Sequence, residues 1–326
     1  MALWLSGIVP VAAEPTVPIL PLSEIRAGQR NRENSLERNS NRRIQSEILG
    51  VLENAGPKQS IILARLSGGP LDKTGVLQGM SGSPVYIDGK LAGAVAMAFP
   101  FSKEPVAGIR PIAEMLDTVP TPRQQAMRAN LRNGSVFPAI SVTERDTSRP
   151  IEIATPISFS GFSSRTMETF GNQLRSVGLE PRQGLTGGRS SARLGPIKTE
   201  PGSMISVQLV TGDMAVGADG TVTHVDGDRI YAFGPKFLSL GATDLPFSSA
   251  SVLTLLANVS TSFKISSTVG ETLGGVTTDT TAAVSGQLGR KPRMVPVTIS
   301  VTGAGNPTSY RMNMVHDRLL SPMCCK

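Results

Sequence analysis

The sequence predicts a mostly β protein with a few short helices. Glycine (34) and proline (24) are abundant among the 326 residues, and aromatic residues make up only 4%. Valine, threonine and serine recur in short runs between glycines and prolines. This composition favours short strands and turns over helix bundles. The length allows one large domain or two modest ones, with a full core.

A serine among small residues is the centre of the most informative stretch. Residues 79–84 read Gly-Met-Ser-Gly-Ser-Pro and precede two apolar runs, 85–87 and 91–95, joined by Asp88-Gly89. Asp-Gly tolerates the positive φ of a two-residue turn, so a tight hairpin is predicted. The glycines would let the N–H groups of Gly79 and Ser81 converge on an oxyanion. The residues alone leave two interpretations open: a nucleophile loop, or a glycine-serine turn entering an ordinary hairpin.

The same stretch resembles a known family. Gly-Met-Ser-Gly-Ser-Pro-Val (79–85) is preceded by Leu-Ala-Arg-Leu-Ser-Gly (63–68) and followed by Phe-Pro-Phe-Ser-Lys-Glu-Pro-Val-Ala-Gly-Ile (99–109). These motifs are similar to those of the SpoIVB peptidases, and the similarity spans residues 46–116 and roughly 201–320. The resemblance implies a serine peptidase with a chymotrypsin-like double β-barrel. The serine would precede the histidine site, so the barrels would be rearranged in chain order.

The resemblance also locates the catalytic groups. Ser81 would be the nucleophile, and the general-base histidine would follow a Phe-Gly pair. In this chain that pair is followed by Pro235, which has no ring nitrogen to accept a proton. The family's orienting aspartate falls nearest Ser67, with Asp72 five residues later as the available carboxylate. Asp72 is therefore a weak catalytic candidate, and an exposed turn residue is the alternative.

Three other side chains carry a nitrogen that could in principle replace the missing base. His224 is expected to pair with Arg229 across the Asp226-Gly227 turn, as a surface histidine far from Pro235. His316 matches a non-catalytic histidine of the family. Lys236 would need strong desolvation to act as a base, so a solvated lysine is the simpler interpretation.

The chain divides by composition. Residues 1–13 resemble the apolar part of a secretory signal, without its basic start, and favour export to the periplasm or cell surface. Residues 14–45 are expected to be a disordered basic segment, in which 26–44 lack apolar periodicity and would leave one barrel short of a strand. Residues 46–180 form the serine-bearing β half, 181–200 a flexible linker, and 201–326 a second β half carrying the altered histidine site.

Within these halves the sequence predicts individual elements. Strands are expected at 47–52, 60–66, 139–143, 151–159, 204–210, 221–225, 228–233, 261–267, 281–288 and 294–301. Helices are expected at 112–116, 123–132, 164–177 and 248–257.

Charge and cysteine content limit the partners. The net charge of +7 comes from two segments, 26–43 and 181–198, which are rich in glycine, serine or asparagine and lack aromatic residues. They read as solvated linkers, so nucleic acid is not an expected partner. Cys324 and Cys325 are adjacent and suit neither a metal site nor a disulfide framework. We expect no cofactor, no metal and no integral membrane segment.

The leading hypothesis is an exported serine endopeptidase that cuts a peptide or protein substrate, weakened or inactivated by Pro235. One alternative is an inactive peptidase-fold module that binds an extended peptide. Another is a truncated, non-functional gene product, suggested by the 26–44 segment, Pro235 and the Cys-Cys-Lys end.

Overall fold

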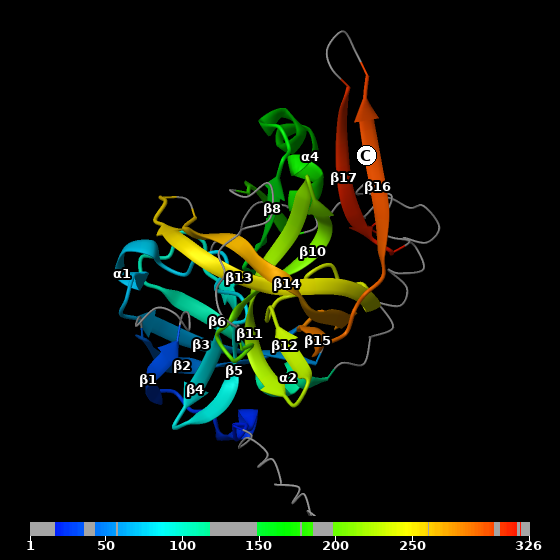
Figure 1. The fold of residues 1–326 in the computed structure, drawn as a ribbon. Coiled ribbons are helices and arrows are strands. Elements are labelled where there is room, and N and C mark those ends of the chain that lie inside the picture. The colour runs from blue at the N-terminus through cyan, green and yellow to red at the C-terminus, as the bar shows by residue number, and fades with distance from the viewer. Residues whose placement is uncertain are drawn as a thin grey trace, which may run out of the picture.

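The strands of the protein form two sheets that lie against each other (Figure 1). The computed structural model describes residues 17–35, 43–56, 58–117, 149–176, 178–184, 198–259, 261–302, 307–317 and 320. Every strand pairing is antiparallel among these residues except that of β8 with β9. The prediction of a mostly β protein is confirmed.

The first sheet contains the serine stretch. Its seven strands have the order β1-β2-β3-β6-β5-β4, and β7 also pairs with β5. They are β1 (Arg30–Ser35), β2 (Arg43–Gly56), β3 (Gln59–Ser67), β4 (Pro84–Ile87), β5 (Lys90–Ala98), β6 (Val106–Pro111) and β7 (Ile151–Glu152).

The second sheet has ten strands in the order β16-β17-β10-β13-β14-β15-β12-β11-β8-β9, and β10 also pairs with β11. They are β8 (Thr155–Ser160), β9 (Leu179–Gln183), β10 (Met204–Gly212), β11 (Ala215–Asp226), β12 (Arg229–Ala232), β13 (Gly241–Leu256), β14 (Phe263–Asp279), β15 (Val284–Leu288), β16 (Met294–Val301) and β17 (Thr308–Val315). Because β10 pairs with both β13 and β11, the sheet closes on itself at this strand.

Helices are short and peripheral. They are η1 (Leu22–Glu24), α1 (Leu71–Thr74), α2 (Ile112–Leu116) and α4 (Ser164–Ser176). The predicted helices at 112–116 and 164–177 are confirmed. In α4 the exposed polar residues outnumber the packed ones, and Leu174 contacts the core of the second sheet.

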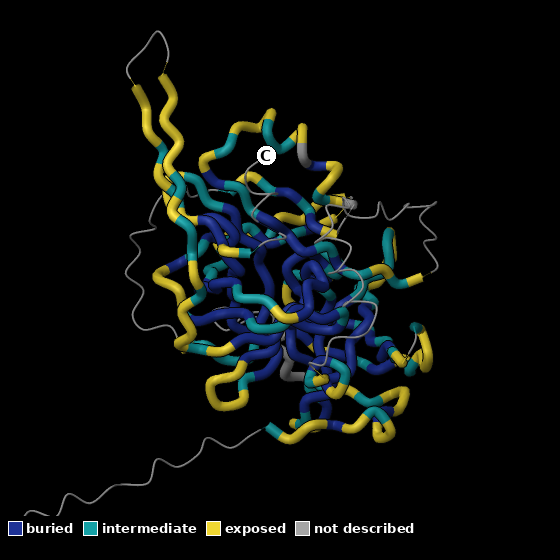
Figure 2. Tube along the Cα trace, turned by 90° about the vertical axis from the view of Figure 1, so that its right-hand side faces the viewer, coloured by how far each residue is buried: buried dark blue, intermediate teal, exposed yellow. Residues whose placement is uncertain are grey.

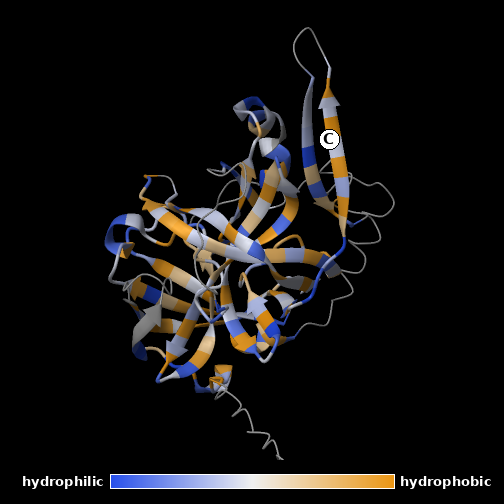
Figure 3. Ribbon diagram, in the orientation of Figure 1, coloured by the Kyte–Doolittle hydropathy of each residue, from blue (hydrophilic) through white to orange (hydrophobic). Residues whose placement is uncertain are grey.

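Each sheet has its own apolar core (Figure 2). Ile48, Ile62 and Ile109 centre the core of the first sheet, and Val207, Phe233 and Phe247 centre that of the second. A small third cluster, which includes Leu91 and Ala283, joins the two sheets. By contrast, β16 and β17 project from the body as a largely exposed hairpin. Apolar and polar residues alternate along β16 (Figure 3), and the strand predicted at 294–301 is confirmed.

The Asp88-Gly89 turn is confirmed. Asp88 (φ 49°) and Gly89 (φ 77°) connect β4 to β5, and positive φ at both positions is the reason for the Asp-Gly pair. The second turn is displaced by one residue from the prediction: Asp226 pairs with Arg229, so Gly227 (φ 59°) and Asp228 form the turn.

The prediction that residues 26–44 lack regular structure is wrong for β1. This strand pairs with β2, so the first sheet does not lack a strand there. Arg30 forms an ion pair with Glu47 at 2.8 Å across the two strands. Backbone pairing at a sheet edge needs no apolar periodicity, which is why the hydrophobic pattern failed to reveal it.

Three further predictions need correction. Residues 248–257 are not helical, because 248–256 belong to β13 and pair with β14 along its whole length. Residues 181–183 of the predicted linker belong to β9, which pairs in parallel with β8. β8 and the first two residues of β9 fall in the predicted first half, yet both strands hydrogen-bond into the second sheet. All three segments are fixed by pairing with strands distant in sequence, and a local sequence pattern does not reveal such pairing.

Some predictions lie outside the described residues. These are the signal-like segment 1–13, the helix at 123–132, the strand at 139–143, most of the 181–200 linker, and Cys324 and Cys325.

Replacement of Gly82 tests how closely the two sheets approach. A Cβ at Gly82 (φ 89°) would lie 2.1 Å from the Thr221 carbonyl oxygen and 2.7 Å from the Phe233 nitrogen. We expect Gly82→Ala to lower the free energy of unfolding by about 3 kcal/mol or more, from the left-handed backbone plus the overlap. Chemical denaturation measures it.

Gly89→Ala is the matched control. Gly89 also has positive φ (77°), but nothing lies within 4 Å of its Cβ position. This variant should lose only about 1–2 kcal/mol. Equal losses in the two variants would contradict the close approach.

Candidate functional site

The Ser81 loop is a tight backbone turn between α1 and β4. Gly79 and Gly82 both have φ of 89°, a conformation that side-chain-bearing residues rarely adopt. The Ser83 N–H donates to the Met80 carbonyl at 2.9 Å, and the Gly82 N–H donates to the Val95 carbonyl of β5 at 2.9 Å. The glycines of this stretch therefore allow the backbone turn that holds Ser81 in place.

The Ser81 side chain is fully buried, with a relative exposure of 0%. No group among the described residues hydrogen-bonds to its Oγ. Buried hydroxyls normally find a partner, so an unpaired one marks a strained or functional position.

Two backbone donors beside this hydroxyl are also unused. Within the described part of the chain, the N–H groups of Met80, Gly82 and Ser83 each donate to a carbonyl, whereas those of Gly79 and Ser81 donate to none. These two are the N–H groups that the sequence predicted for an oxyanion site. An unpaired hydroxyl with two unpaired donors beside it is the arrangement that acyl transfer requires.

Strand β11 of the second sheet holds the Ser81 loop. The Thr221 N–H donates to the Ser81 carbonyl at 3.1 Å. The Thr221 hydroxyl donates to the Gly79 carbonyl at 3.3 Å, and the Thr223 hydroxyl donates to the Gly82 carbonyl at 2.7 Å. The nucleophile candidate of one sheet is thus positioned by the other sheet.

The corner that carries the altered histidine position adjoins this loop. Phe233 (φ 77°) and Gly234 (φ 63°) are consecutive left-handed residues, and the Phe233 N–H donates to the Thr221 carbonyl at 3.1 Å. A Cβ at Gly234 would lie 3.2 Å from the Gly82 nitrogen. Pro235 follows directly and is buried. The structure therefore places the residues next to Pro235 in contact with the residues next to Ser81.

Phe233 is strained as well as buried. A bulky residue with positive φ costs on the order of 1–3 kcal/mol, and such outliers cluster at functional sites. The corner keeps this conformation even though Pro235 offers no base.

Asp279 fixes the segment that follows Pro235. Its carboxylate accepts N–H bonds from Phe237 (3.3 Å), Leu238 (2.8 Å) and Leu240 (3.1 Å). Burial raises the pKa of Asp279 from 3.8 to about 6, although these N–H bonds oppose the rise. Sequence reasoning missed this residue, because a lone aspartate at the end of a strand carries no motif.

None of the three substitute bases hydrogen-bonds to the Ser81 Oγ. His224 pairs with Tyr231, not with Arg229 as predicted, because the turn falls at Gly227 and Asp228, one residue later than predicted. It is buried, not a surface residue, and its ring stacks on Tyr231 with centroids 6.1 Å apart. Burial lowers its pKa.

The remaining two have other surroundings. His316 is exposed at the base of the β16–β17 hairpin, where its N–H donates to the Arg293 carbonyl. The Lys236 ammonium lies 3.5 Å from Glu152 of β7, so it forms an ion pair.

The orienting-acid positions are also separate from the buried hydroxyl. Asp72 is exposed in the first turn of α1, and Ser67 ends β3. Lys264 of β14, which sequence reasoning did not consider, packs its stem over Gly79: a Cβ there would lie 3.1 Å from the Lys264 Cδ. No group of three His, Cys, Asp or Glu side chains that could hold a metal occurs in the described ranges.

The comparison with protein families now adds to this geometry. Residues 9–116 match the family model SpoIVB peptidase S55. The resemblance stated on the sequence is confirmed for residues 46–116, and its second part, roughly 201–320, lies outside the matched residues. The SpoIVB-matching segment includes the Ser81 loop and the hairpin that follows it, and it supports a SpoIVB-like serine peptidase. No curated protein and no solved structure matches the chain.

Asp279→Asn tests the buried carboxylate. Since the folded state holds the Asp279 proton up to about pH 6 and the unfolded state releases it near pH 4, the free energy of unfolding should fall as pH rises between these values. The fall is on the order of 3 kcal/mol at about 1.36 kcal/mol per pH unit. Asparagine keeps an acceptor oxygen without titrating, so the fall should be smaller in this variant, and what remains includes the contribution of buried Asp219, whose pKa is also raised.

Urea denaturation from pH 4 to 6.5 checks this slope. Asp72→Asn removes an exposed carboxylate and should retain the wild-type slope. An unchanged slope in Asp279→Asn would show that Asp279 does not titrate in this range.

Proposed function

We propose that the chain is a SpoIVB-like serine endopeptidase with impaired hydrolysis, in which Ser81 is the nucleophile. The observation that carries the proposal is the unpaired Ser81 Oγ beside the two unused N–H groups of Gly79 and Ser81. In peptide hydrolysis, Oγ would bond to the scissile carbonyl carbon while its proton passes to a base. The carbonyl oxygen would gain negative charge and accept hydrogen bonds from the two N–H groups.

Pro235 accounts for the impairment. Expulsion of the amine needs the proton that a histidine would take from Ser81 and deliver to the leaving nitrogen. Loss of the base in a serine triad costs about 10⁶-fold in turnover, and the oxyanion donors with binding leave roughly 10³–10⁴-fold over water. An oxyanion geometry at the Ser81 loop together with a missing base fits a very weak hydrolase.

Burial of Ser81 also reduces the expected rate of hydrolysis. At 0% exposure its Oγ cannot meet a substrate in the observed arrangement. Attack would require the Phe233–Pro235 corner or the Lys264 side chain to move, since both pack against this loop.

The substrate would be a peptide bond in a protein of the bacterial envelope. The apolar run at the N-terminus, residues 3–13, supports export to the periplasm or cell surface. Among the described residues, none of the helices has the length and apolar character needed to span a bilayer.

A second candidate is a peptide-binding module that does not cut. The buried hydroxyl favours it, because a ligand could be held by the surrounding strands without reaching Ser81. The two candidates differ in whether restoring a base restores reactivity.

A fluorophosphonate probe compares the wild-type chain with Pro235→His and Pro235→Ala. We expect negligible labelling of the wild type and of Pro235→Ala, and labelling at least about 100-fold faster in Pro235→His, because only histidine supplies a base. Peptide mass spectrometry should place the label on Ser81, and Ser81→Ala in the Pro235→His background should abolish it.

Pro235→Ala controls for the loss of the proline ring, and thermal melts show whether each variant folds. Equal labelling of Pro235→His and Pro235→Ala, with both folded, would contradict the missing-base account. Labelling that survives Ser81→Ala would contradict the nucleophile assignment.

A further inference from the structure

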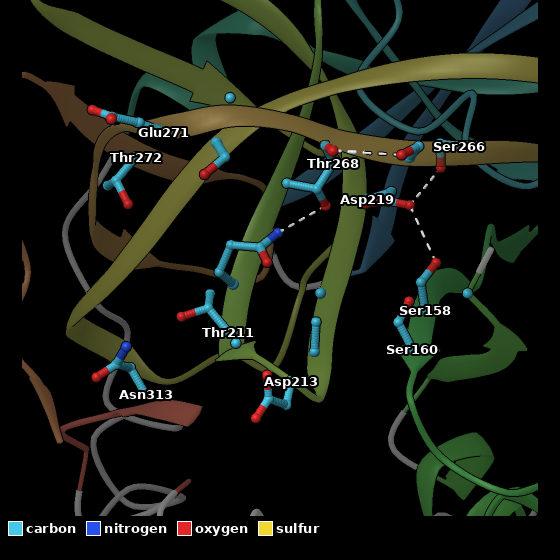
Figure 4. A pocket seen from close by; sticks show the side chains of 18 residues that line it. Ser158, Ser160, Thr211, Asp213, Asp219, Ser266, Thr268, Glu271, Thr272 and Asn313 are labelled. Atoms are coloured by element: carbon cyan, nitrogen blue, oxygen red, sulfur yellow. Dashed lines mark hydrogen bonds between the residues drawn. The ribbon is translucent and has the colours of Figure 1, made fainter. Parts of the chain in front are cut away.

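A polar cavity lies within the second sheet, away from Ser81. It has a volume of about 940 Å³ and is lined by residues of several strands, among them β8, β10, β11 and β14 (Figure 4). Its lining side chains are hydroxyls, amides and carboxylates, among them Ser158, Gln208, Asp213, Asp219, Thr268 and Glu271. Apart from glycines, Ala215 is the single apolar residue among the described lining residues, and none is Lys, Arg or His. The cavity is therefore polar and carries negative charge.

Strand register connects this cavity to the Ser81 loop. Met204 of β10 pairs with Thr221 of β11, and the Thr221 hydroxyl contacts both the Gly79 carbonyl and the Met204 sulfur. The Lys264 ammonium lies 3.7 Å from the same sulfur. Thr221, Met204 and Lys264 form a first row of side chains directly beneath the Ser81 loop.

The next row belongs to the cavity. Two residues along the same strands, Ser206 pairs with Asp219, and Ser266 of β14 contacts the Asp219 carboxylate at 2.5 Å. Side chains two residues apart share one face of a strand and lie roughly 7 Å apart. Asp219 therefore lies one row, about 7 Å, from the threonine that holds the Ser81 loop.

A third row continues the cavity outward. Gln208 pairs with Gly217 across β10 and β11, and its amide donates to the Thr268 hydroxyl at 3.2 Å. The Gln208 side chain packs over Gly217, since a Cβ there would lie 2.8 Å from the Gln208 amide nitrogen. The second and third rows therefore both line the cavity with polar side chains.

Asp219 has hydrogen-bond donors but no cation. The Ser266 and Ser158 hydroxyls, at 2.5 and 3.4 Å, both bond to Oδ2, as Figure 4 shows. No ion pair involves Asp219 in the described part of the chain. The residue is 4% exposed, and burial raises its pKa. A carboxylate out of water without a cation is costly, and a cationic ligand would relieve that cost.

We infer that this cavity is a specificity site for a lysine or arginine side chain of a peptide, with Asp219 as its counter-ion. The choice of a peptide rests on the proposed function, because the first row connects the cavity to the Ser81 loop. Asp213 and Glu271 at the cavity wall add negative charge along the path of the side chain. The hydroxyl and amide groups supply acceptors for the remaining N–H bonds of a guanidinium.

Other ligand classes fit less well. An anion would face three carboxylates with no cationic partner among the described lining residues. An apolar side chain would bury polar groups without hydrogen bonds. A sugar ring would find no aromatic side chain to stack on.

Peptide binding to the unmodified chain tests the inference without any need for hydrolysis. Dye-labelled hexapeptides that differ only at one central residue (arginine, lysine, citrulline, norleucine or glutamate) are compared by fluorescence anisotropy. We expect the arginine and lysine peptides to bind at least about tenfold more tightly than the norleucine and citrulline peptides. Asp219→Asn should remove this preference and leave norleucine binding unchanged.

Two further variants make the result interpretable. Asp228→Asn removes an exposed carboxylate outside the cavity and should leave the preference intact. If Asp219→Asn fails to fold, Thr268→Lys takes its place as the test. It retains Asp219 but places an ammonium in the cavity, and it should abolish arginine-peptide binding.

The outcomes separate this inference from the proposed function. Equal binding of arginine and norleucine peptides, or an unchanged preference in folded Asp219→Asn, would overturn the cationic site even if Pro235→His labels at Ser81. An Asp219-dependent preference with no labelling of Pro235→His would support the cavity and count against the peptidase.

Discussion

The hydrogen bond from the Thr221 N–H to the Ser81 carbonyl is the contact on which the site depends. With the two threonine hydroxyl bonds beside it, it fixes a loop of the first sheet on a strand of the second. Neither sheet contains a complete site. Because β11 also receives the Phe233 N–H at the Thr221 carbonyl, one short strand segment positions both the candidate nucleophile and the corner that should carry its base.

Contacts on both sides hold the backbone around Pro235. The left-handed Phe233-Gly234 corner precedes this residue, and the carboxylate of Asp279 binds the segment that follows it. Proline is compatible with this corner because it has no N–H that needs a partner. Under the proposed function, proline in place of histidine here would remove the proton acceptor while the hydrogen bonds between the sheets remain.

Local chemistry made parts of the fold predictable. The Asp88-Gly89 turn, the turn at Gly227 and the Ser81 loop follow from glycine's access to positive φ. The local pattern does not reveal the strands at 248–256 and Arg30–Ser35, because they are stabilised by partners distant in sequence. The register at His224, and the roles of Asp219 and Asp279, likewise depend on contacts between strands, which residue spacing along one strand does not encode.

A crystal structure of Pro235→His would test the central claim most directly, through the distance between the introduced imidazole and the Ser81 Oγ. The account predicts that one ring nitrogen lies within hydrogen-bonding reach of Oγ, about 3 Å, or is joined to it through one water. An imidazole more than roughly 7 Å from Oγ, with the Thr221–Ser81 contact intact, would contradict it, because the corner would then never have carried the base.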